Sequence, residues 1–371
     1  MNSLIITQLS IAHAGVFNIL MFLVLMSIAA VTRSTVPGFN AFDNFNGYLK
    51  TWTWPKSLKF NPTREDLFSG QRVQSHKAAG QIKCSASQGI SLTPIFALYV
   101  QLIVMPMGCQ CEVACKVALA LCDLIEALLA TQARLTTPDQ LRSRVRTLLR
   151  CCVNAGYEES FVPKFHWLLH LPDHLQRFGM LVTCWVHERK HKAVKRFAAD
   201  IKNHTVYSKS VLREVLTQQL WSMRQDCAVI LSNILVMPTR APAAARDYIQ
   251  EALQTDAEVH LSVEAKLGSG ATAHSRDVVL IASRDGINFV AGHIERFVSV
   301  DAVGDFAMVS SYVLESSDEN TGCVIWTIAD TAATLVNLSL VLAPCVWSKL
   351  SPSRIRILVP YQSRGLKAVA A

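Results

Sequence analysis

The period of the hydrophobic pattern changes along this chain, and this change constrains the fold more than any other feature. Up to residue 236 the apolar residues recur mainly at helical spacing, whereas beyond residue 270 they fall into short β-branched and aromatic runs. Thr137 before Pro138, an apolar stripe through Leu141 and Val145, and Gly156 predict a capped helix. Further helices are expected over residues 111–131, 163–178, 186–203 and 208–236.

Short runs in the last third of the chain predict strands separated by turn sequences such as Asp285-Gly286. They cover residues 278–281, 288–297, 306–314, 323–328 and 355–359. We therefore expect an α+β protein, with a mainly helical N-terminal region followed by a small β-rich barrel or sandwich domain. The expected organisation is an apolar segment at 1–40, a helical domain at 41–238, a linker at 239–270 and the β-rich domain at 271–363.

Residues 14–32 carry no charge, and Arg33 is the only charged side chain before Asp43. A helix of this length, at about 1.5 Å per residue, nearly crosses a bilayer core of about 30 Å. A membrane anchor is one interpretation, and a core helix of a larger domain is the other. No Lys or Arg precedes the run and Asn18 lies inside it, which argues against a cleavable signal peptide.

The eleven cysteines are odd in number and lie largely in helical apolar patterns, as Cys111, Cys115 and Cys122 do. This usage excludes a secreted disulfide framework and favours a reducing compartment. With 51% hydrophobic and 17% charged residues, the composition also excludes a disordered chain.

Most of the positive charge is local. The formal net charge is +8, and residues 184–213 hold eight basic side chains against Glu188 and Asp200, which leaves +6. Trp185 and Phe197 are interleaved with these basic residues. Such a surface is typical of proteins that neutralise phosphates, so DNA is the expected partner. The candidate DNA-binding residues are Arg189, Lys190, Lys192, Lys195, Arg196 and Lys202.

Residues 187–191 have the form H-E-x-x-H, in which two histidines hold zinc and the glutamate is the base of a peptidase. A zinc hydrolase is therefore an alternative class. Arg189 and Lys190 at the central positions argue against it, as do Val194 and Phe197 where the extended motif needs Gly and His. The plainer interpretation is a solvated helix with lysines on its wetted face.

His166, His170 and His174 recur at i, i+4 and i+8, a spacing that places side chains on one helix face. Pro172 interrupts this segment. We therefore expect a structural role for the three histidines rather than a shared metal site.

Two stretches resemble a known family. They are PKFHWLLHLP at 163–172 and CWVHERKHK at 184–192, with Gly179 between them. Shorter upstream pieces agree: GVFN at 15–18, WTWP at 52–55 and KCSASQG at 83–89. In this order, residues 15–220 resemble the C-terminal part of a CACTA-like DDE transposase. The β-rich tail resembles the region that such elements carry after the transposase core.

The resemblance implies a ribonuclease-H-like core in which three carboxylates hold two divalent metals around a phosphodiester. Glu188 corresponds to the third acid. Cys184 and His187 match a C-x-x-H pair, which provides candidate zinc ligands together with His191 or a cysteine such as Cys115. The resemblance also implies a transposable-element protein that binds DNA in the nucleus.

The sequence departs from the family in its acids. No Asp or Glu precedes Asp43, so the first two aspartates have no counterpart and Glu188 is a vestigial third acid. We therefore expect a transposon-derived protein without catalysis, which retains DNA binding and in which Mg²⁺ belongs only to an intact ancestral enzyme. Residues 14–32 are then a remnant core helix. The alternative is a single-pass membrane protein of unknown function, located in a membrane through residues 14–32.

Overall fold

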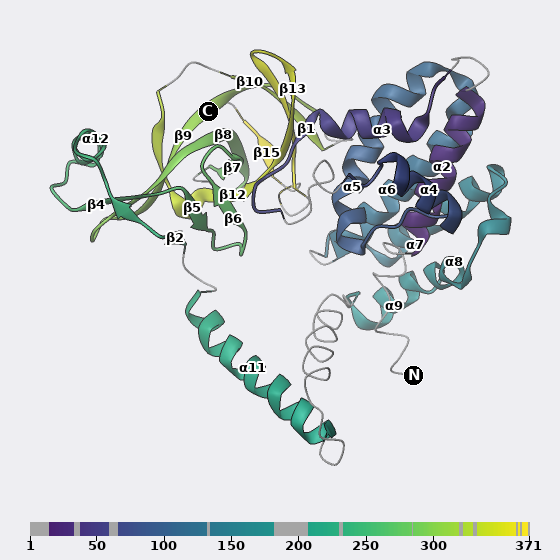
Figure 1. The fold of residues 1–371 in the computed structure, drawn as a ribbon, viewed down its shortest axis with the longest axis horizontal. Helices are drawn as coiled ribbons and strands as arrows, with labels where there is room; N and C mark the ends of the chain where they lie inside the picture. Colours follow the sequence, from purple (N-terminus) through teal and green to yellow (C-terminus); the bar gives the residue numbers. More distant parts are fainter. Residues whose placement is uncertain are drawn as a thin grey trace. The chain divides into compact units, whose positions relative to one another are not determined.

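The chain forms two compact units, Met1–Lys50 with Phe60–Asp200, and Thr51–Lys59 with Ile201–Ala371. Figure 1 shows helices throughout the first unit and a curved sheet in the second. The α+β fold class expected from the sequence is therefore confirmed. The computed structural model describes residues 15–32, 38–58, 66–131, 134–181, 207–229, 233–283, 285–318, 322–328, 332–360, 363 and 366–369.

An uncharged helix, α2 (Phe17–Thr32), lies in the core of the helical unit. Ten of its sixteen residues are buried, and Phe17 and Leu20 have no exposed surface. Two helices, α3 (Ala41–Lys50) and α6 (Glu112–Ala130), pack against it. α6 buries eleven of its nineteen residues in turn, because it has apolar neighbours on several sides.

The remaining helices of this unit begin and end where local sequence signals place them. Ser85 accepts a hydrogen bond from the backbone of Gln88 and forms a capping box at the start of α5. The helix predicted over 163–178 is divided in two, since Pro172 lacks an N–H and fits only the first turn of a new helix. The bounds are α4 (Gly70–Ala79), α5 (Ala86–Tyr99), α7 (Pro138–Asn154), α8 (Pro163–Leu168) and α9 (Leu171–Phe178).

One helical stretch of the described residues, Ala86–Met107, is long and apolar enough to cross a membrane. Half of its most apolar window is buried inside the fold. The apolar helix Phe17–Thr32 is shorter and is buried over most of its surface. Burial of this kind is typical of core helices in a globular unit.

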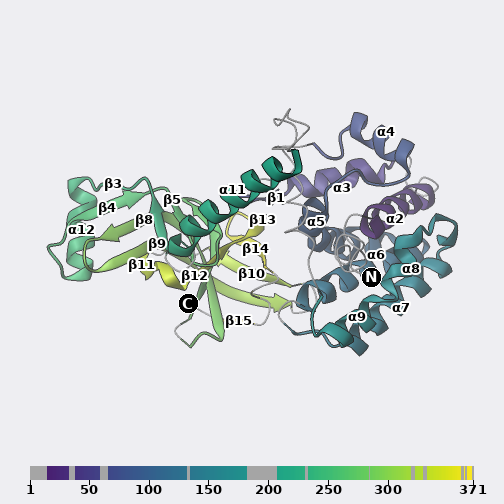
Figure 2. The same ribbon diagram turned by 90° about the horizontal axis from the view of Figure 1, so that it is seen from below.

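A long antiparallel pair, β8 (Asn288–Val300) with β9 (Gly304–Asp318), forms the centre of the β unit. The main path of the sheet runs β1-β13-β14-β10-β9-β8-β4-β3, and the strands curve into a half-barrel (Figure 2). A smaller sheet has the order β2-β5-β6. The other strands are β1 (Trp52–Thr53), β2 (Ile234–Val236), β3 (Thr239–Arg240), β4 (Val259–Ser262), β5 (Glu264–Lys266), β6 (Thr272–His274), β7 (Val278–Ala282), β10 (Cys323–Ile328), β11 (Thr334–Asn337), β12 (Val341–Pro344), β13 (Val346–Ser351), β14 (Arg354–Leu358) and β15 (Lys367–Ala368).

The structure differs from the sequence-based expectation between residues 207 and 270. The predicted helix 208–236 corresponds to α11 (Tyr207–Val229), and its expected last residues form β2 instead. The stretch 239–270, expected as a linker, contains β3, α12 (Ala243–Leu253), β4 and β5. A run as short as Ile234 to Val236 is apolar throughout, so its period alone does not separate a strand from a helix.

A segment from early in the chain completes one edge of the main sheet. β1 pairs with β13, and the guanidinium of Arg356 lies 5.2 Å from the ring centroid of Trp52. The backbone N–H of Lys56 donates to a carboxylate oxygen of Asp277 at 3.3 Å, and Lys56 Nζ donates to the carbonyl oxygen of Ser275 at 3.1 Å. Residues 51–58 are therefore held in the β unit by a strand pair, a cation–π contact and two hydrogen bonds.

Gly292 lies where β8 packs closely on β9, and a Cβ there would come within 2.5 Å of Val309 Cγ1 and 2.7 Å of the Ser310 carbonyl oxygen. We expect Gly292→Ala to lower the free energy of unfolding by about 2 kcal/mol, because the backbone neighbour cannot move aside cheaply. The matched control is Gly47→Ala in α3, where nothing lies within 4 Å. This control is expected to be stabilising by about 0.5–1 kcal/mol. Urea unfolding measures both, and equal stability of Gly292→Ala and wild type would contradict the expectation.

The imidazole of His76 is fully buried in the helical unit. Its Nδ1 accepts a hydrogen bond from the Lys83 N–H at 3.1 Å, so the proton of the neutral ring is assigned to Nε2, which lies 2.9 Å from the Leu67 carbonyl oxygen. Burial lowers the pKa of His76, and the charges of Arg72 and Lys83 add to the effect against the opposing hydrogen bond to Leu67.

The lowered pKa of His76 gives a pH dependence of stability. The unfolded chain takes up a proton at about pH 6.5 and the native chain only at lower pH, so the free energy of unfolding decreases as the pH falls below about 6.5. His76→Gln removes this contribution. The loss of stability between about pH 7.5 and 5.5, measured by urea unfolding, is expected to be smaller in the variant than in wild type. An unchanged loss would show that His76 does not cause it.

Candidate nucleic-acid interface

The described residues carry a row of basic side chains on α7. Thr137 caps this helix through a capping box with Gln140, and Pro138 occupies its first turn. Leu141, Val145, Leu148 and Cys152 form the buried stripe of the helix, which packs on α6. The helix α9 also packs against α7, and the rest of the surface of α7 is open to solvent.

Five side chains on the open side of α7 form what we call the α7 strip. Its three arginines follow one another at i, i+4 and i+8, so they span about 12 Å along the helix axis. Two hydroxyl side chains lie beside them. Together with Asp139, these residues line an open hollow of about 730 Å³. The members of the α7 strip are Arg142, Ser143, Arg146, Thr147 and Arg150.

Ion pairs occupy only part of the basic surface of α7. Arg142 contacts both Asp139 and Asp173, the second at 3.0 Å, and Arg144 contacts Asp123 at 3.0 Å. Within the part of the chain that the structure describes, neither Arg146 nor Arg150 forms an ion pair. Both are exposed. The far end of the α7 strip is thus a positive surface that no acidic side chain of the described residues neutralises.

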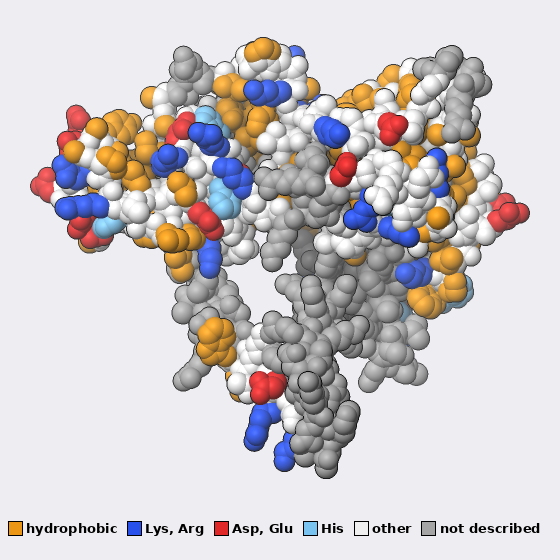
Figure 3. All heavy atoms as spheres, in the orientation of Figure 1, with side chains coloured by type: hydrophobic (Ala, Val, Ile, Leu, Met, Phe, Trp, Pro, Cys, Tyr) orange, Lys and Arg blue, Asp and Glu red, His pale blue; other side chains and the backbone are white. Residues whose placement is uncertain are grey.

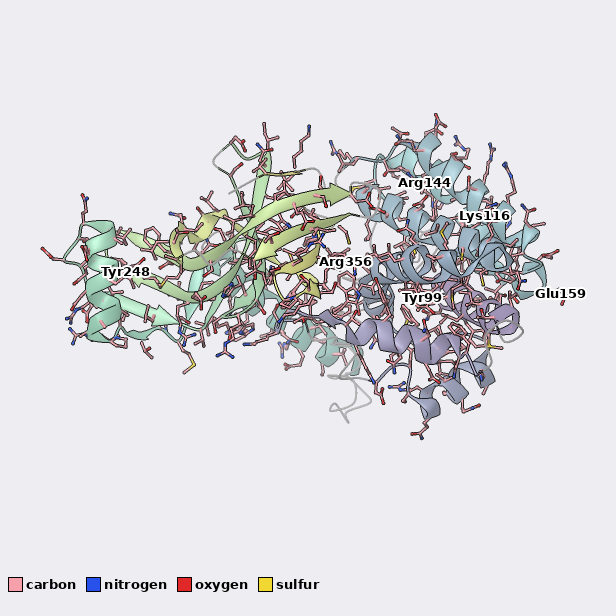
Figure 4. All side chains as sticks on the ribbon, turned by 90° about the horizontal axis from the view of Figure 1, so that it is seen from above. Tyr99, Lys116, Arg144, Glu159, Tyr248 and Arg356 are labelled. Carbon is pink, nitrogen blue, oxygen red and sulfur yellow. The ribbon has the colours of Figure 1, made fainter. Side chains whose placement is uncertain are left out.

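A second, smaller hollow of about 330 Å³ lies on the other side of the hydroxyl groups. Ser143 and Thr147 line both hollows, and Asp123 and Arg144 contribute to the smaller one. Figure 4 shows Arg144 on α7 and Lys116 on α6 at the outer surface of the helical unit, whereas Tyr99 lies inside it. The hydroxyl groups are therefore accessible to a ligand from both sides.

The site residues predicted from the sequence lie outside the described residues, in the interval 182–206. Nothing is therefore assigned to their geometry. They are the vestigial acid Glu188, the candidate zinc ligands Cys184, His187 and His191, and the candidate DNA-binding residues Arg189, Lys190, Lys192, Lys195, Arg196 and Lys202. The α7 strip was not predicted from the sequence, although arginines at i, i+4 and i+8 in a helix with a capping box were a sufficient signal.

Among the residues that the structure describes, no three His, Cys, Asp or Glu side chains gather closely enough to hold a metal ion. Burial raises the pKa of Cys115, an additional zinc ligand suggested by the family resemblance, to about 12. Burial likewise raises the pKa of Cys84 and Cys152 to about 12. At neutral pH these thiols are protonated and pack as small apolar groups.

No family model, no curated protein and no solved structure matches this chain. The geometry that bears on function in the described part of the chain is the α7 strip, with two arginines that no carboxylate neutralises.

Proposed function

We propose that this protein binds nucleic acid through the phosphate backbone and that it is a transposon-derived, DNA-binding protein of the nucleus. The observation that carries the proposal is the α7 strip, with Arg146 and Arg150 exposed. Guanidinium and hydroxyl groups are among the side-chain groups that contact phosphate oxygens of DNA. A row of them along one helix therefore suits a ligand with regularly repeated phosphates.

The basic interval 184–213, with its excess of six positive charges, supports the same partner. Contacts to phosphates fix a protein on the duplex without reading bases, so little sequence preference is expected. The proposal is confined to binding. Glu188 is the acid that the transposase resemblance matches, and it lies outside the described residues, so no catalytic step is assigned to it.

The position of α2 supports this proposal over the membrane alternative. α2 is buried by its neighbours in the helical unit, and the side chains of Leu20, Val24 and Leu25 have no surface left for lipid. A single-pass anchor presents such side chains to the acyl chains instead. Alkaline carbonate extraction of the expressed protein separates the two proposals, since an inserted chain stays with the membrane pellet.

The combined variant Arg142→Ala, Arg146→Ala and Arg150→Ala tests the α7 strip. We expect its affinity for double-stranded DNA to fall on the order of tenfold at moderate salt. A protein that neutralises fewer phosphates releases fewer counterions from the DNA on binding. The slope of log affinity against log salt should become shallower by about one unit for each phosphate contact that is lost. Fluorescence anisotropy with a labelled duplex, repeated between about 50 and 200 mM salt, measures both quantities.

The matched control removes the same charge from the β unit. Arg240, Arg246 and Arg354 each form an ion pair, with Glu258, Asp247 and Glu315 respectively. Figure 3 shows acidic and basic side chains intermixed over the α12 end of this unit. Replacing the three control arginines with alanine is expected to change DNA affinity by less than about twofold. Equal losses in the two triple variants would indicate a general charge effect and would remove the α7 strip from the proposal.

A separate variant tests the basic interval. Changing Lys192, Lys195 and Arg196 to alanine is expected to weaken DNA binding and to reduce the salt slope, for the same electrostatic reason. The six substitutions combined should lower affinity further than either set alone if both surfaces contact phosphates. Unchanged affinity in the Lys192, Lys195 and Arg196 variant would exclude this interval from the interface, whatever the result for α7.

A further inference from the structure

Two exposed histidines at the junction of α8 and α9 point their ring nitrogens at each other. The Nε2 atoms of His166 and His170 are 3.2 Å apart, and the ring planes are inclined by 77°. Phe165 and Leu168, on the opposite face, are buried and anchor the segment. The anchoring places both imidazoles at the surface with a fixed spacing.

We propose that His166 and His170 bind a divalent transition-metal ion of the zinc class through their Nε2 atoms. Zinc lies about 2.0–2.1 Å from an imidazole nitrogen. If an ion lies at that distance from both atoms, the angle between its two bonds to nitrogen is about 100–106°, close to the tetrahedral value that zinc adopts. The separation of the two Nε2 atoms is therefore the one that chelation requires.

A hydrogen bond between the two rings explains the contact less well. Both imidazoles are exposed, so water satisfies each nitrogen and a bond between them adds little stability. Holding two ring nitrogens together at the surface also restricts two side chains that otherwise rotate freely. A metal ion gives this arrangement a favourable free energy, because imidazole nitrogen is a preferred ligand of zinc, copper and nickel.

The two histidines leave coordination positions for other ligands. Within the described residues, no third His, Cys, Asp or Glu joins them to complete a group of three. Among the described residues, the remaining positions are left to water or an exogenous donor. Because His166 belongs to α8 and His170 directly precedes α9, a bound ion ties the two short helices together and stabilises the native chain by linkage.

The test is titration of metal-free full chain with zinc chloride by calorimetry. It uses a background with Cys184→Ser, His187→Asn and His191→Asn, which removes the other candidate zinc ligands. We expect one equivalent of zinc to bind, and either His166→Asn or His170→Asn to weaken binding by at least about tenfold. His174→Asn is the control: it removes a histidine from the same segment and is expected to leave the affinity unchanged.

A second measurement uses the wild-type chain. Zinc is expected to slow the modification of His166 and His170 by diethyl pyrocarbonate, read by mass spectrometry, and to leave His174 as reactive as before. Zinc binding of equal strength in the His166→Asn and His170→Asn variants, or the absence of protection at both histidines in wild type, would overturn the proposal.

Discussion

An uncharged helix, α2, needs apolar neighbours on most of its surface, and this requirement orders the helical unit. α6 supplies part of the cover and is itself largely buried, so it needs a further neighbour. α7 packs on α6 through a single apolar stripe, and part of its remaining surface is exposed to solvent. α9 packs on α7 in turn. The arginines of α7 and the histidines beside α9 lie at the surface, because the apolar residues of α2, α6 and the α7 stripe already form the core.

The distribution of acids decides which cations remain free for a ligand. On α7, Asp139, Asp173 and Asp123 neutralise the arginines of the first two turns, and the last two turns receive no acid from the described residues. In the β unit, Arg240 and Arg354 each face a glutamate. Surface ion pairs of this kind contribute little to stability, but they cancel the local field that attracts phosphates. A count of basic residues alone therefore overestimates the binding surface.

The elements that the sequence predicted well are those with local signals. Thr137, Pro138 and the apolar stripe located α7, and short β-branched and aromatic runs located β7, β8 and β10. Strands of two to four residues, such as β2 and β3, were missed because distant partners stabilise them rather than their own pattern. The arginine spacing of α7 was readable, whereas the pairing of Arg142 with Asp173 depends on how two helices meet. Likewise the i, i+4 relation of His166 and His170 was readable from the sequence. Pro172 argued against a continuous helix, however, and the short distance between the two rings was not foreseen.

The pairing of β1 with β13 has a consequence for biosynthesis. The edge strand leaves the ribosome about 300 residues before its partner, which at ordinary elongation rates is an interval on the order of tens of seconds. During that interval Trp52 and Thr53 have no strand to pair with. The helices on either side of them in the chain belong to the helical unit, whose packing partners are synthesised earlier. The sheet of the second unit is thus complete only after β13 has been synthesised. A gene fragment that begins after residue 60 encodes a sheet that lacks this edge strand.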